Sequence, residues 1–512
     1  MKKLLLILFC SPLLLTAQSQ RQTNYWTASA ACSVQGFAPL AGGGNVLCGF
    51  SKYGSDSAHI NLIFMTDSDV TMSHREFNTA TIFDFASHLI SFNNGFLIGG
   101  KSSDPSFFHP EIISTDGSGN VLWAKYFNST SYWQGQIIRI IPHGSTYSMY
   151  TYAETPVNDF YRIEGDASGN TFSGWQYTPD TTMSFRVFDA EQMYNSSSHI
   201  LCGHSDFNSA ANRGGMLMKV TTSGIQWCRH ITAGGNTKED IVDVAAGTDG
   251  NSYSVFVCEN MPGNQYSTIV LKFDSLGNKV WAKQLTINNG TVNGCSIIES
   301  ASHDFYVASY DNLFNAYITK LDVSGNLIWT RKWTAASGLA SGLKLFKDNN
   351  GNIVFTGLLA GTYFVARLDA NAGGCGFTNS TAISSANANT TLTNITFTTT
   401  AFTPTYVSEQ TVYTAQGYTE NMICGGLGMD ELNASAFEIY PNPAQQTLSI
   451  RSALTSIRSI AVFNMLGEMV LNVQPQHSGD HADLDVSRLS PGIYSICISD
   501  GEKNYFNKFI KQ

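Results

Sequence analysis

The acidic run EDIVD at residues 239–243 contains side chains that could do chemistry. The carboxylates of Glu239, Asp240 and Asp243 could coordinate a calcium ion or act as acid and base in a hydrolysis reaction. The run also falls at the start of a predicted strand, where acidic residues often have a structural role. We favour the structural interpretation and keep hydrolysis as an alternative.

The histidines do not form a recognisable ligand set. Their positions show no metal-ligand spacing, so we expect structural roles for His109, His143, His199, His204, His230 and His303. The sequence also contains no GxSxG, phosphate-loop or HExxH motif. We therefore predict no catalytic residue, no metal site and no cofactor.

Aromatic side chains are the remaining candidates for ligand contact, because their faces bind sugar rings well. Those that fall outside the regular pattern described below are Phe107, Phe108, Tyr132, Trp133, Tyr310 and Phe314. A chain this rich in aromatic residues will expose some of them in any case. The ligand-binding residues therefore stay unassigned.

Cysteine spacing excludes a zinc site of the CxxC type. Cys375 and Cys424 bracket a polar segment and are the best candidates for a disulfide. Closing that loop would stabilise the fold by roughly 4 kcal/mol in the chain-entropy model.

Composition and charge narrow the class of protein. Only 13% of the 512 residues are charged and the net charge is −10, which argues against nucleic acid as a partner. Residues 1–19 form an expected signal peptide, in which Lys2 and Lys3 precede an apolar core from Leu4 to Leu15. That core is too short to span a membrane, and no later segment is long enough to be a transmembrane segment.

A motif recurs along most of the chain. An Asp or Thr marks each copy, 47 to 55 residues apart, at Asp67, Asp116, Asp166, Thr221, Asp274, Asp322 and Asp369. Gly follows three residues later in most copies, and Trp follows a few residues after that, as in DVSGNLIW at 322–329. Asp opens a tight turn and Gly supplies its positive φ, so each copy predicts a turn between two strands.

Each copy has room for four short strands and their turns. Such repeats predict a β-propeller, and seven copies predict seven blades over residues 20–374. The last copy lacks its Trp strand, whereas the segment TNYW near the N-terminus supplies an extra strand with Trp26. We expect this segment to complete the last blade and cover its edge.

The repeats resemble a bacterial β-propeller repeat family with the pattern K-x-D-x-x-G-N-x-x-W, and they are similar to the blades of quinoprotein dehydrogenases. The resemblance covers roughly residues 24–370. It implies a fold but no particular activity, because propellers bind, hydrolyse and scaffold alike. A quinone cofactor is not implied, since the likeness rests on turn and Trp positions alone.

Residues 375–435 form a Thr- and Asn-rich connecting segment. No charged residue occurs from Ala370 to Ser408, and stretches such as TLTNITFT alternate as strands do. The segment is then an annex to the propeller or an extended spacer. A disordered linker is the alternative, and we favour strands.

Residues 436–512 have a different character. The segments YPNP, VFNMLG and LSPGIY recur in the order and spacing of the C-terminal sorting domain of the type IX secretion system of Bacteroidetes, which this region resembles. The resemblance assigns the sorting signal to Tyr440, Pro441, Asn442, Pro443, Gly467, Pro491, Gly492, Tyr494 and Lys511. Short strands with Tyr494, Ile496 and Ile498 on one face predict a small immunoglobulin-like β-sandwich.

Together these features predict an all-β, exported protein, secreted or on the outer-membrane surface of a Gram-negative bacterium. The resemblance implies that the type IX machinery recognises the C-terminal domain, which is then cleaved. We expect the body to be a non-catalytic module that binds an extracellular glycan or protein. The alternatives are a polysaccharide hydrolase or lyase with its site at the propeller mouth, which converging carboxylates would favour, and a purely structural surface component.

Overall fold

The computed structural model describes residues 22–512 with gaps. The gaps are 27–30, 41–42, 54–56, 67–70, 79–82, 104–106, 129–134, 153–158, 181–182, 208–212, 235–237, 261–264, 288–291, 301, 314, 334–339, 349–350, 360–361, 369–376, 410–411, 416–418, 425–436, 453–456, 465–468, 474–480 and 500–503. For some strands, including β1, β34 and β35, only the backbone is described. The predicted signal peptide, Cys375 and Gly467 therefore lie outside the described residues, and so does the side chain of Cys424.

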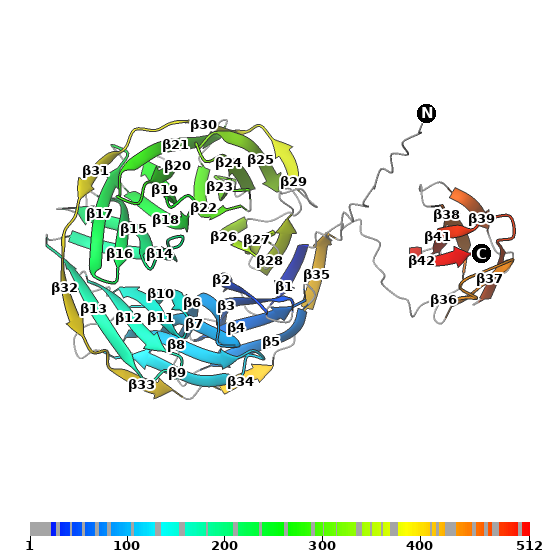
Figure 1. Ribbon diagram of the computed structural model, residues 1–512, viewed down its shortest axis with the longest axis horizontal. Coiled ribbons are helices and arrows are strands. Elements are labelled where there is room, and N and C mark those ends of the chain that lie inside the picture. The colour runs from blue at the N-terminus through cyan, green and yellow to red at the C-terminus, as the bar shows by residue number, and fades with distance from the viewer. Residues whose placement is uncertain are drawn as a thin grey trace, which may run out of the picture. The chain divides into compact units, whose positions relative to one another are not determined.

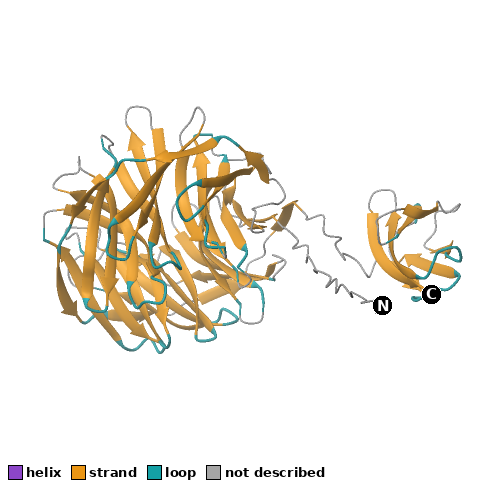
Figure 2. Cartoon of the chain, turned by 45° about the horizontal axis from the view of Figure 1, so that its top comes forward, coloured by secondary structure: helices purple, strands orange, loops and turns teal. Residues whose placement is uncertain are grey.

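All regular structure in the described part of the chain is β-strand (Figures 1 and 2). No helix among those residues has the length and apolar character needed to cross a membrane. The chain divides into two compact units, one within residues 18–425 and one that contains residues 426–512.

The larger unit is a ring of antiparallel sheets (Figure 1). Four of these sheets follow one another around the ring, each with four consecutive strands of the repeat array. The first contains β10 (Ile137–His143), β11 (Thr146–Tyr152), β12 (Phe160–Asp166) and β13 (Phe172–Pro179), and the second contains β14 (Met183–Gln192), β15 (His199–Phe207), β16 (Arg213–Thr221) and β17 (Gly224–Thr232). The third contains β18 (Lys238–Ala246), β19 (Ser252–Asn260), β20 (Gln265–Phe273) and β21 (Lys279–Ile287), and the fourth contains β22 (Val292–Glu299), β23 (Phe305–Asp311), β24 (Ala316–Leu321) and β25 (Leu327–Trp333). In each sheet the first strand lies nearest the centre of the ring.

A ten-stranded sheet and a further five-stranded sheet complete the ring. The ten-stranded sheet contains β2 (Ala31–Pro39), β3 (Asn45–Tyr53), β4 (Ser57–Met65) and β5 (Thr71–Asn78), followed by β6 (Phe83–Phe92), β7 (Gly95–Ser103), β8 (Phe108–Asp116) and β9 (Val121–Phe127). Its two halves are joined through one parallel pairing, Ala58 with Phe83. The five-stranded sheet contains β26 (Ala340–Lys347), β27 (Ile353–Leu359), β28 (Thr362–Leu368) and β1 (Gln22–Trp26).

Strand β1 adds to the sheet of the last repeat, as the sequence predicts. It pairs antiparallel with β28, placing Thr23 opposite Val365 and Tyr25 opposite Tyr363. This pairing joins the two ends of the repeat array in one sheet, and it covers the edge that β28 would otherwise leave open.

The repeated motif works as a contact between neighbouring sheets. In the turn after β20, the carboxylate of Asp274 accepts hydrogen bonds from the backbone of Leu276 and Asn278, and Gly277 has a φ of +79°. Trp227 of the preceding sheet lies against this turn and donates to the carbonyl of Ser275 at 3.1 Å. A Cβ on Gly277 would lie 2.6 Å from the Trp227 ring, so the glycine is required by both the turn and the packing.

The same contact recurs around the ring, with the same geometry. Trp123 donates to Ala167 in the next turn and Trp281 to Val323, at 3.4 and 3.2 Å. The repeat spacing seen in the sequence therefore reflects, in at least these three copies, a Trp-on-turn contact between neighbouring sheets.

The Thr-rich segment forms an outer belt, which we define as the strands between residues 377 and 424. The belt strands are β29 (Phe377–Ser380), β30 (Ile383–Asn387), β31 (Thr391–Asn394), β32 (Phe397–Phe402), β33 (Tyr406–Glu409), β34 (Val412–Ala415) and β35 (Thr419–Cys424). They pair in turn with β25, β21, β17, β13, β9, β5 and β1, so the belt runs around the ring against the order of the repeats (Figure 1). The prediction of strands in this segment is confirmed, and their place is that of an annex.

The smaller unit has two sheets around one core. The first contains β36 (Phe437–Tyr440), β37 (Thr447–Ser452) and β40 (His481–Asp485), and the second β39 (Met469–Val473), β38 (Ser459–Phe463), β41 (Gly492–Ser499) and β42 (Asn504–Lys511). Tyr494, Ile496 and Ile498 are all buried in the core that the sheets share, which confirms the predicted alternation of β41.

Candidate functional site

Each innermost strand contains a β-bulge, whereas only some of the outer strand pairs do. Each of β2, β6, β10, β14, β18, β22 and β26 has a register shift near its middle, where an extra residue interrupts the pairing with the next strand. The residues directly after the shifts are Gly36, His88, Arg139, Asp189, Asp243, Ser296 and Lys344. Bulges re-aim side chains, and here they direct a set of mostly polar residues to the centre of the ring.

Several of these side chains connect one innermost strand to the next. His88 accepts a hydrogen bond from the backbone N–H of Ile140 at 3.1 Å, and Ser296 accepts one from Leu345 at 3.2 Å. Asp243 accepts one from Ile297 at 2.7 Å. Because each acceptor reaches the neighbouring sheet, the polar residues at the centre have a structural role as well as any functional one.

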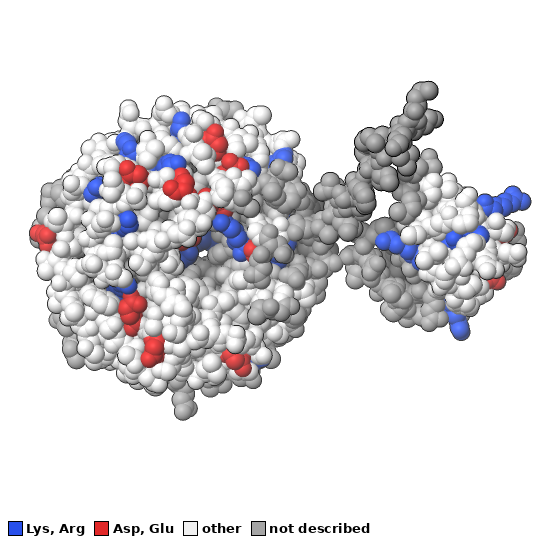
Figure 3. Space-filling model, viewed as in Figure 1, with Lys and Arg blue, Asp and Glu red and all other residues white. Residues whose placement is uncertain are grey.

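Two adjoining cavities lie between the innermost strands. Their volumes are about 140 and 380 Å³, and Arg139, Glu191 and Phe346 line both of them. We call the two together the central channel. The space-filling view shows a hollow at the centre of the ring with Lys and Arg side chains around it (Figure 3).

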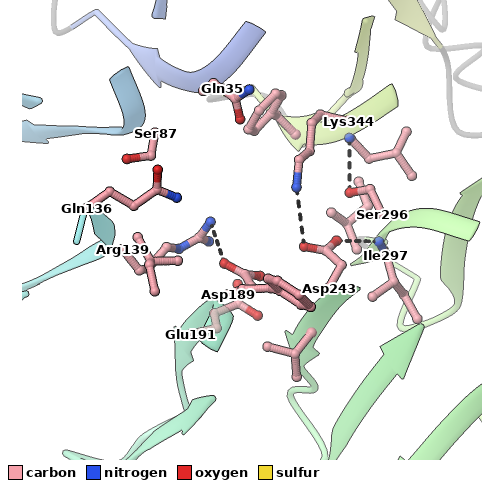
Figure 4. Close-up of a pocket in the computed structure, with 16 residues that line it drawn as sticks. Gln35, Ser87, Gln136, Arg139, Asp189, Glu191, Asp243, Ser296, Ile297 and Lys344 are labelled. Carbon is pink, nitrogen blue, oxygen red and sulfur yellow. Dashed lines mark hydrogen bonds and ion pairs between the residues drawn. The ribbon is translucent and has the colours of Figure 1, made fainter. Parts of the chain in front are cut away.

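Charged groups converge in the smaller cavity (Figure 4). Arg139 Nη1 lies 3.1 Å from Asp189 Oδ1, and Lys344 Nζ lies 3.9 Å from Asp243 Oδ1. The two cationic side chains are 27% and 32% exposed, whereas Asp189 and Asp243 are 7% and 9% exposed. A molecule entering the channel would therefore meet the cations before the carboxylates.

Burial and mutual contact perturb the acids. Burial raises the pKa of Asp243 to about 8, with a further rise from a hydrogen bond to Asp189 and an opposing effect of Lys344. Burial also raises the pKa of Glu191, although Arg139 and a hydrogen bond from the backbone of Ala246 oppose it. Asp243 thus carries less than a full negative charge at neutral pH.

Burial acts on the basic groups in the opposite sense. It holds the pKa of His88 well below its ordinary value, and the positive charges of Arg139 and Lys344 lower it further. For Lys344, burial alone would lower the pKa, but the negative charge on Asp243 and Asp189 raises it overall. The channel therefore keeps two full cations at neutral pH beside a neutral imidazole.

The direct contact between Asp189 and Asp243 limits the chemistry of the pair. Glycosidases hold two carboxyl groups about 5 Å or more apart, so that the scissile bond fits between them. Asp189 lies close enough to Asp243 to raise the pKa of Asp243, which does not suit a pair held apart by a scissile bond. The arrangement therefore suits recognition through the two cations better than hydrolysis between the two acids.

The acidic run identified in the sequence does not act as one group. Glu239 accepts from the backbone N–H of Ala233 at 3.0 Å, and Asp240 forms a two-point ion pair with Arg213 at 2.8 Å. Only Asp243 reaches the central channel. The structural interpretation fits Glu239 and Asp240, whereas Asp243 also belongs to the candidate site.

The histidines lie in separate neighbourhoods of the ring. His143 stacks on His199 at 4.9 Å, and His199 is also hydrogen-bonded to Tyr150 at 2.6 Å. The others contact Tyr126 (His109), Arg213 (His204), Ser205 (His230) and Thr248 (His303). Within the described ranges, no three His, Cys, Asp or Glu side chains are grouped as a metal site would require.

The aromatic candidates are not gathered at one place. Phe107 is exposed, Lys101 lies over the ring of Phe108 at 4.2 Å, and the hydroxyl of Tyr310 accepts from Asn293 at 2.7 Å. Tyr132, Trp133 and Phe314 fall outside the described residues. The aromatic pair nearest the channel is instead Phe37 and Phe346, which stack at 5.5 Å.

Sequence reasoning missed Arg139, Asp189, Glu191 and Lys344. A signal for three of them exists in the short segments IRI, FDA and LKL, each with one charged residue between apolar neighbours in the innermost strand of its repeat. Aligning the copies on these segments, rather than on the turn motif alone, would have pointed to the channel.

The proposed sorting residues lie in the smaller unit. The side chain of Asn442 accepts from the backbone N–H of Ile510 at 2.9 Å and donates to the carbonyl of Lys508 at 3.3 Å, so the YPNP segment contacts strand β42. Both prolines of this segment follow cis peptide bonds. Tyr494 stacks on Phe509 at 5.6 Å, and Lys511 is buried in β42. Pro491 and Gly492 lie at the start of β41.

Comparisons of the whole chain with known proteins give distant similarities. No curated protein sequence matches the chain. Among solved structures it is similar to Sqt1 from Chaetomium thermophilum, at 11% identity and a TM-score of 0.38 over 68% of this chain and 97% of that chain. It is also similar to a europium-containing methanol dehydrogenase, at 9% identity and a TM-score of 0.33 over 60% of this chain and 72% of that chain.

The smaller unit has a family match. Residues 438–512 match the family described as a secretion system C-terminal sorting domain. That match agrees with the motifs of the sequence, and it indicates a secreted protein that uses type IX secretion machinery. The C-terminal part of this chain is thus a secretion system C-terminal sorting domain, carried behind an all-β body of repeated sheets.

Proposed function

We propose that the protein is an exported seven-bladed β-propeller that binds an extracellular ligand in its central channel and does not catalyse a reaction. The observation that carries this proposal is that Arg139 and Lys344 converge on one cavity. Both cationic side chains are more exposed than the carboxyl groups of Asp189 and Asp243 with which they pair. Ligand sites are typically concave, with a few placed polar groups and apolar walls. The larger cavity, at about 380 Å³ with Phe37 and Phe346 in its wall, has those features.

The blade count rests on the sheet topology. The ten-stranded sheet divides into two blades, because its halves are joined only through the pairing of Ala58 with Phe83. Counting those halves with the five-stranded sheets of the ring gives the seven copies of the sequence motif. We assign the propeller blades to residues 20–374, the belt to the connecting segment 375–435, and an immunoglobulin-like sorting domain to 436–512.

A hydrolase or lyase acting on polysaccharide is the second candidate. Asp189, Glu191 and Asp243 converge at the channel, and the raised pKa of Asp243 is of the kind that general acids have. The closeness of Asp189 to Asp243, which raises the pKa of Asp243, speaks against a two-carboxylate glycosidase mechanism. We therefore rank binding first.

A paired assay separates the two functions. The purified full chain is applied to an array of bacterial, plant and host glycans, and the same glycans are incubated with the protein and analysed for new reducing ends or unsaturated products. We expect retention on a subset of glycans without product. Product formation that disappears in Asp243→Asn would instead establish the hydrolase or lyase, and neither retention nor product would overturn both.

A further inference from the structure

We propose that the central channel recognises the carboxylate of an acidic sugar, with Lys344 and Arg139 as its anion contacts and the Phe37–Phe346 pair as the wall against the sugar ring. This inference rests on the proposed binding function and names its ligand class. Carboxylates are bound well by a guanidinium and an ammonium group that lie on the same cavity. Both side chains line the smaller cavity.

The position of Lys344 carries the inference furthest. Its Nζ atom lies 3.9 Å from Asp243 Oδ1, which is beyond hydrogen-bond distance. Among the residues that the structure describes, the ammonium makes no closer polar contact. A lysine side chain that is about two-thirds covered and still lacks a hydrogen-bonded acceptor is ready to receive one from a ligand.

The sheet-joining role seen at this position in other strands does not explain the cations. At the same position in neighbouring strands, His88, Asp243 and Ser296 each accept a backbone N–H from the next sheet. An ammonium or guanidinium cannot accept a hydrogen bond, so Lys344 and Arg139 cannot make this link. Arg139 pairs instead with the buried Asp189, whereas the charge of Lys344 serves another purpose at a position where an acceptor would join the sheets.

The charge state of the channel also favours an anion. Burial raises the pKa of Asp243, so the acid nearest to Lys344 carries less than a full negative charge at neutral pH. Arg139 is neutralised by Asp189, but it is the more exposed member of that pair. The space-filling view shows Lys and Arg side chains beside the hollow, together with acidic ones (Figure 3).

The remaining lining fits a sugar. The larger cavity continues from Arg139 along Phe37, Leu89 and Phe346, which give it an apolar wall of the kind that packs on a pyranose face. Gln35 and Gln136 line the smaller cavity, and their amides can both donate to and accept from hydroxyl groups. A carboxylate, hydroxyls and an apolar face occur together in a uronic acid.

The test uses short oligogalacturonates and their methyl esters, in which a methyl group removes the charge of each carboxyl group. Calorimetric titration of the full chain should give at least about tenfold tighter binding of the acid than of the ester, the effect of one charged hydrogen bond. Lys344→Gln should lose about tenfold for the acid and leave binding of the ester unchanged. Lys283→Gln, which removes the same charge at an exposed contact with Asn387, is the matched control and should bind as the wild type does.

The outcomes distinguish the ligand class from the function. Equal affinity for acid and ester, or an unchanged affinity in Lys344→Gln, would overturn the acidic-sugar assignment while leaving glycan binding in place. Binding of a short peptide through its terminal carboxylate, without binding of the oligogalacturonates, would replace the sugar by a protein ligand. Lys344→Gln is preferred to a change at Arg139, because removing Arg139 would leave the buried Asp189 without its ion-pair partner, and the unfolding temperature of each variant confirms that it folds.

Discussion

The innermost strands and the outer belt both run around the whole ring, yet they are built from different residues. The innermost strands place Arg139, Asp189, Asp243 and Lys344 in or beside a buried cavity. The belt has no charged residue from Phe377 to Ser408, and its strands β29, β31 and β32 are mostly exposed. Buried charged side chains thus occur at the inner edge of the ring, whereas the belt has no charged residue from Phe377 to Ser408.

The belt is held by its backbone and by a few apolar side chains. Ile383 and Ile395 are buried, and other belt residues pack against the cores between sheets. The anchors are Phe377, Ile383, Leu392, Ile395, Phe397 and Phe402. The belt is therefore suited to closing the ring, because it pairs with strand edges that would otherwise be open.

This difference indicates that the belt mainly stabilises the fold, whereas the innermost strands form the candidate binding site. Changes at the belt should affect unfolding and aggregation without changing ligand preference, whereas changes at the innermost strands should affect ligand binding and the pH dependence.

The largest effect is expected on replacing residues 377–424 with a Gly/Ser sequence of equal length. Each buried apolar anchor contributes roughly 1.5–3 kcal/mol, and the outer edge of every sheet would become unpaired. We expect the unfolding temperature to fall by about 10 °C or more, with aggregation, as measured by calorimetry and light scattering.

A chain with residues 425–436 replaced in the same way is the control, since those residues lie outside the belt. A belt-replaced protein that stays monomeric and unfolds at the wild-type temperature would mean that the inner strands alone close the ring.

The sequence predicts the ring of repeats better than the pairing of the belt, because the contacts that form the ring lie within one repeat or between neighbouring repeats. The turn motif fixes the ring, because Asp274, Gly277 and Trp227 act through contacts within one repeat or to the next one. The belt strands were predictable as strands from alternation and low charge, but not as partners of particular sheets. Pairings such as Thr399 with Tyr177 span more than two hundred residues, and nothing local encodes them.

The candidate site was only partly predictable for a similar reason. Asp243 was found because it stands in an acidic run, whereas Lys344 stands alone between two leucines. Its partner Asp243 comes from two repeats earlier in the chain, and only closure of the ring brings the two together. The predicted disulfide between Cys375 and Cys424 remains a prediction, because it lies outside the described residues and side chains.

An intermediate loss of stability is expected when a turn glycine is replaced by alanine. Comparing two such glycines separates the contribution of Trp packing from that of the turn backbone. Gly277 and Gly250 have nearly the same φ, +79° and +80°. A Cβ at position 277 would meet the Trp227 ring at 2.6 Å, whereas nothing lies within 4 Å of one at position 250. Gly250→Ala should cost about 1–2 kcal/mol of unfolding free energy for the left-handed backbone alone. Gly277→Ala should cost roughly 1–3 kcal/mol more, for displacing the Trp.

Urea unfolding followed by Trp fluorescence measures both values. Equal costs for the two variants would show that the Trp-on-turn contact yields easily, and that the sheets are joined mainly through the inner edge and the belt.

The last prediction concerns the pH dependence that the inner edge should confer and the belt should not. The folded protein keeps a proton on Asp243 up to a pKa of about 8, whereas the unfolded chain releases it near pH 4. The folded state therefore binds more protons between these limits, and this group lowers the free energy of unfolding as the pH rises through that window. Asp243→Asn removes the titration while keeping an acceptor for the N–H of Ile297. Its stability relative to the wild type should increase by up to about 1.4 kcal/mol per pH unit between about pH 5 and pH 8, and then level off.

Asp240→Asn is the matched control for this measurement, because it lies on the same strand but pairs with Arg213 away from the channel. Loss of that ion pair should destabilise the protein at neutral pH without producing the same rise with pH. Urea titrations of the three proteins across the window give the slopes directly. A stability difference between Asp243→Asn and wild type that stays constant with pH would show that Asp243 titrates as an ordinary carboxylate. Lys344 would then be neutralised at physiological pH, and the channel would lose the excess positive charge on which recognition of an acidic sugar depends.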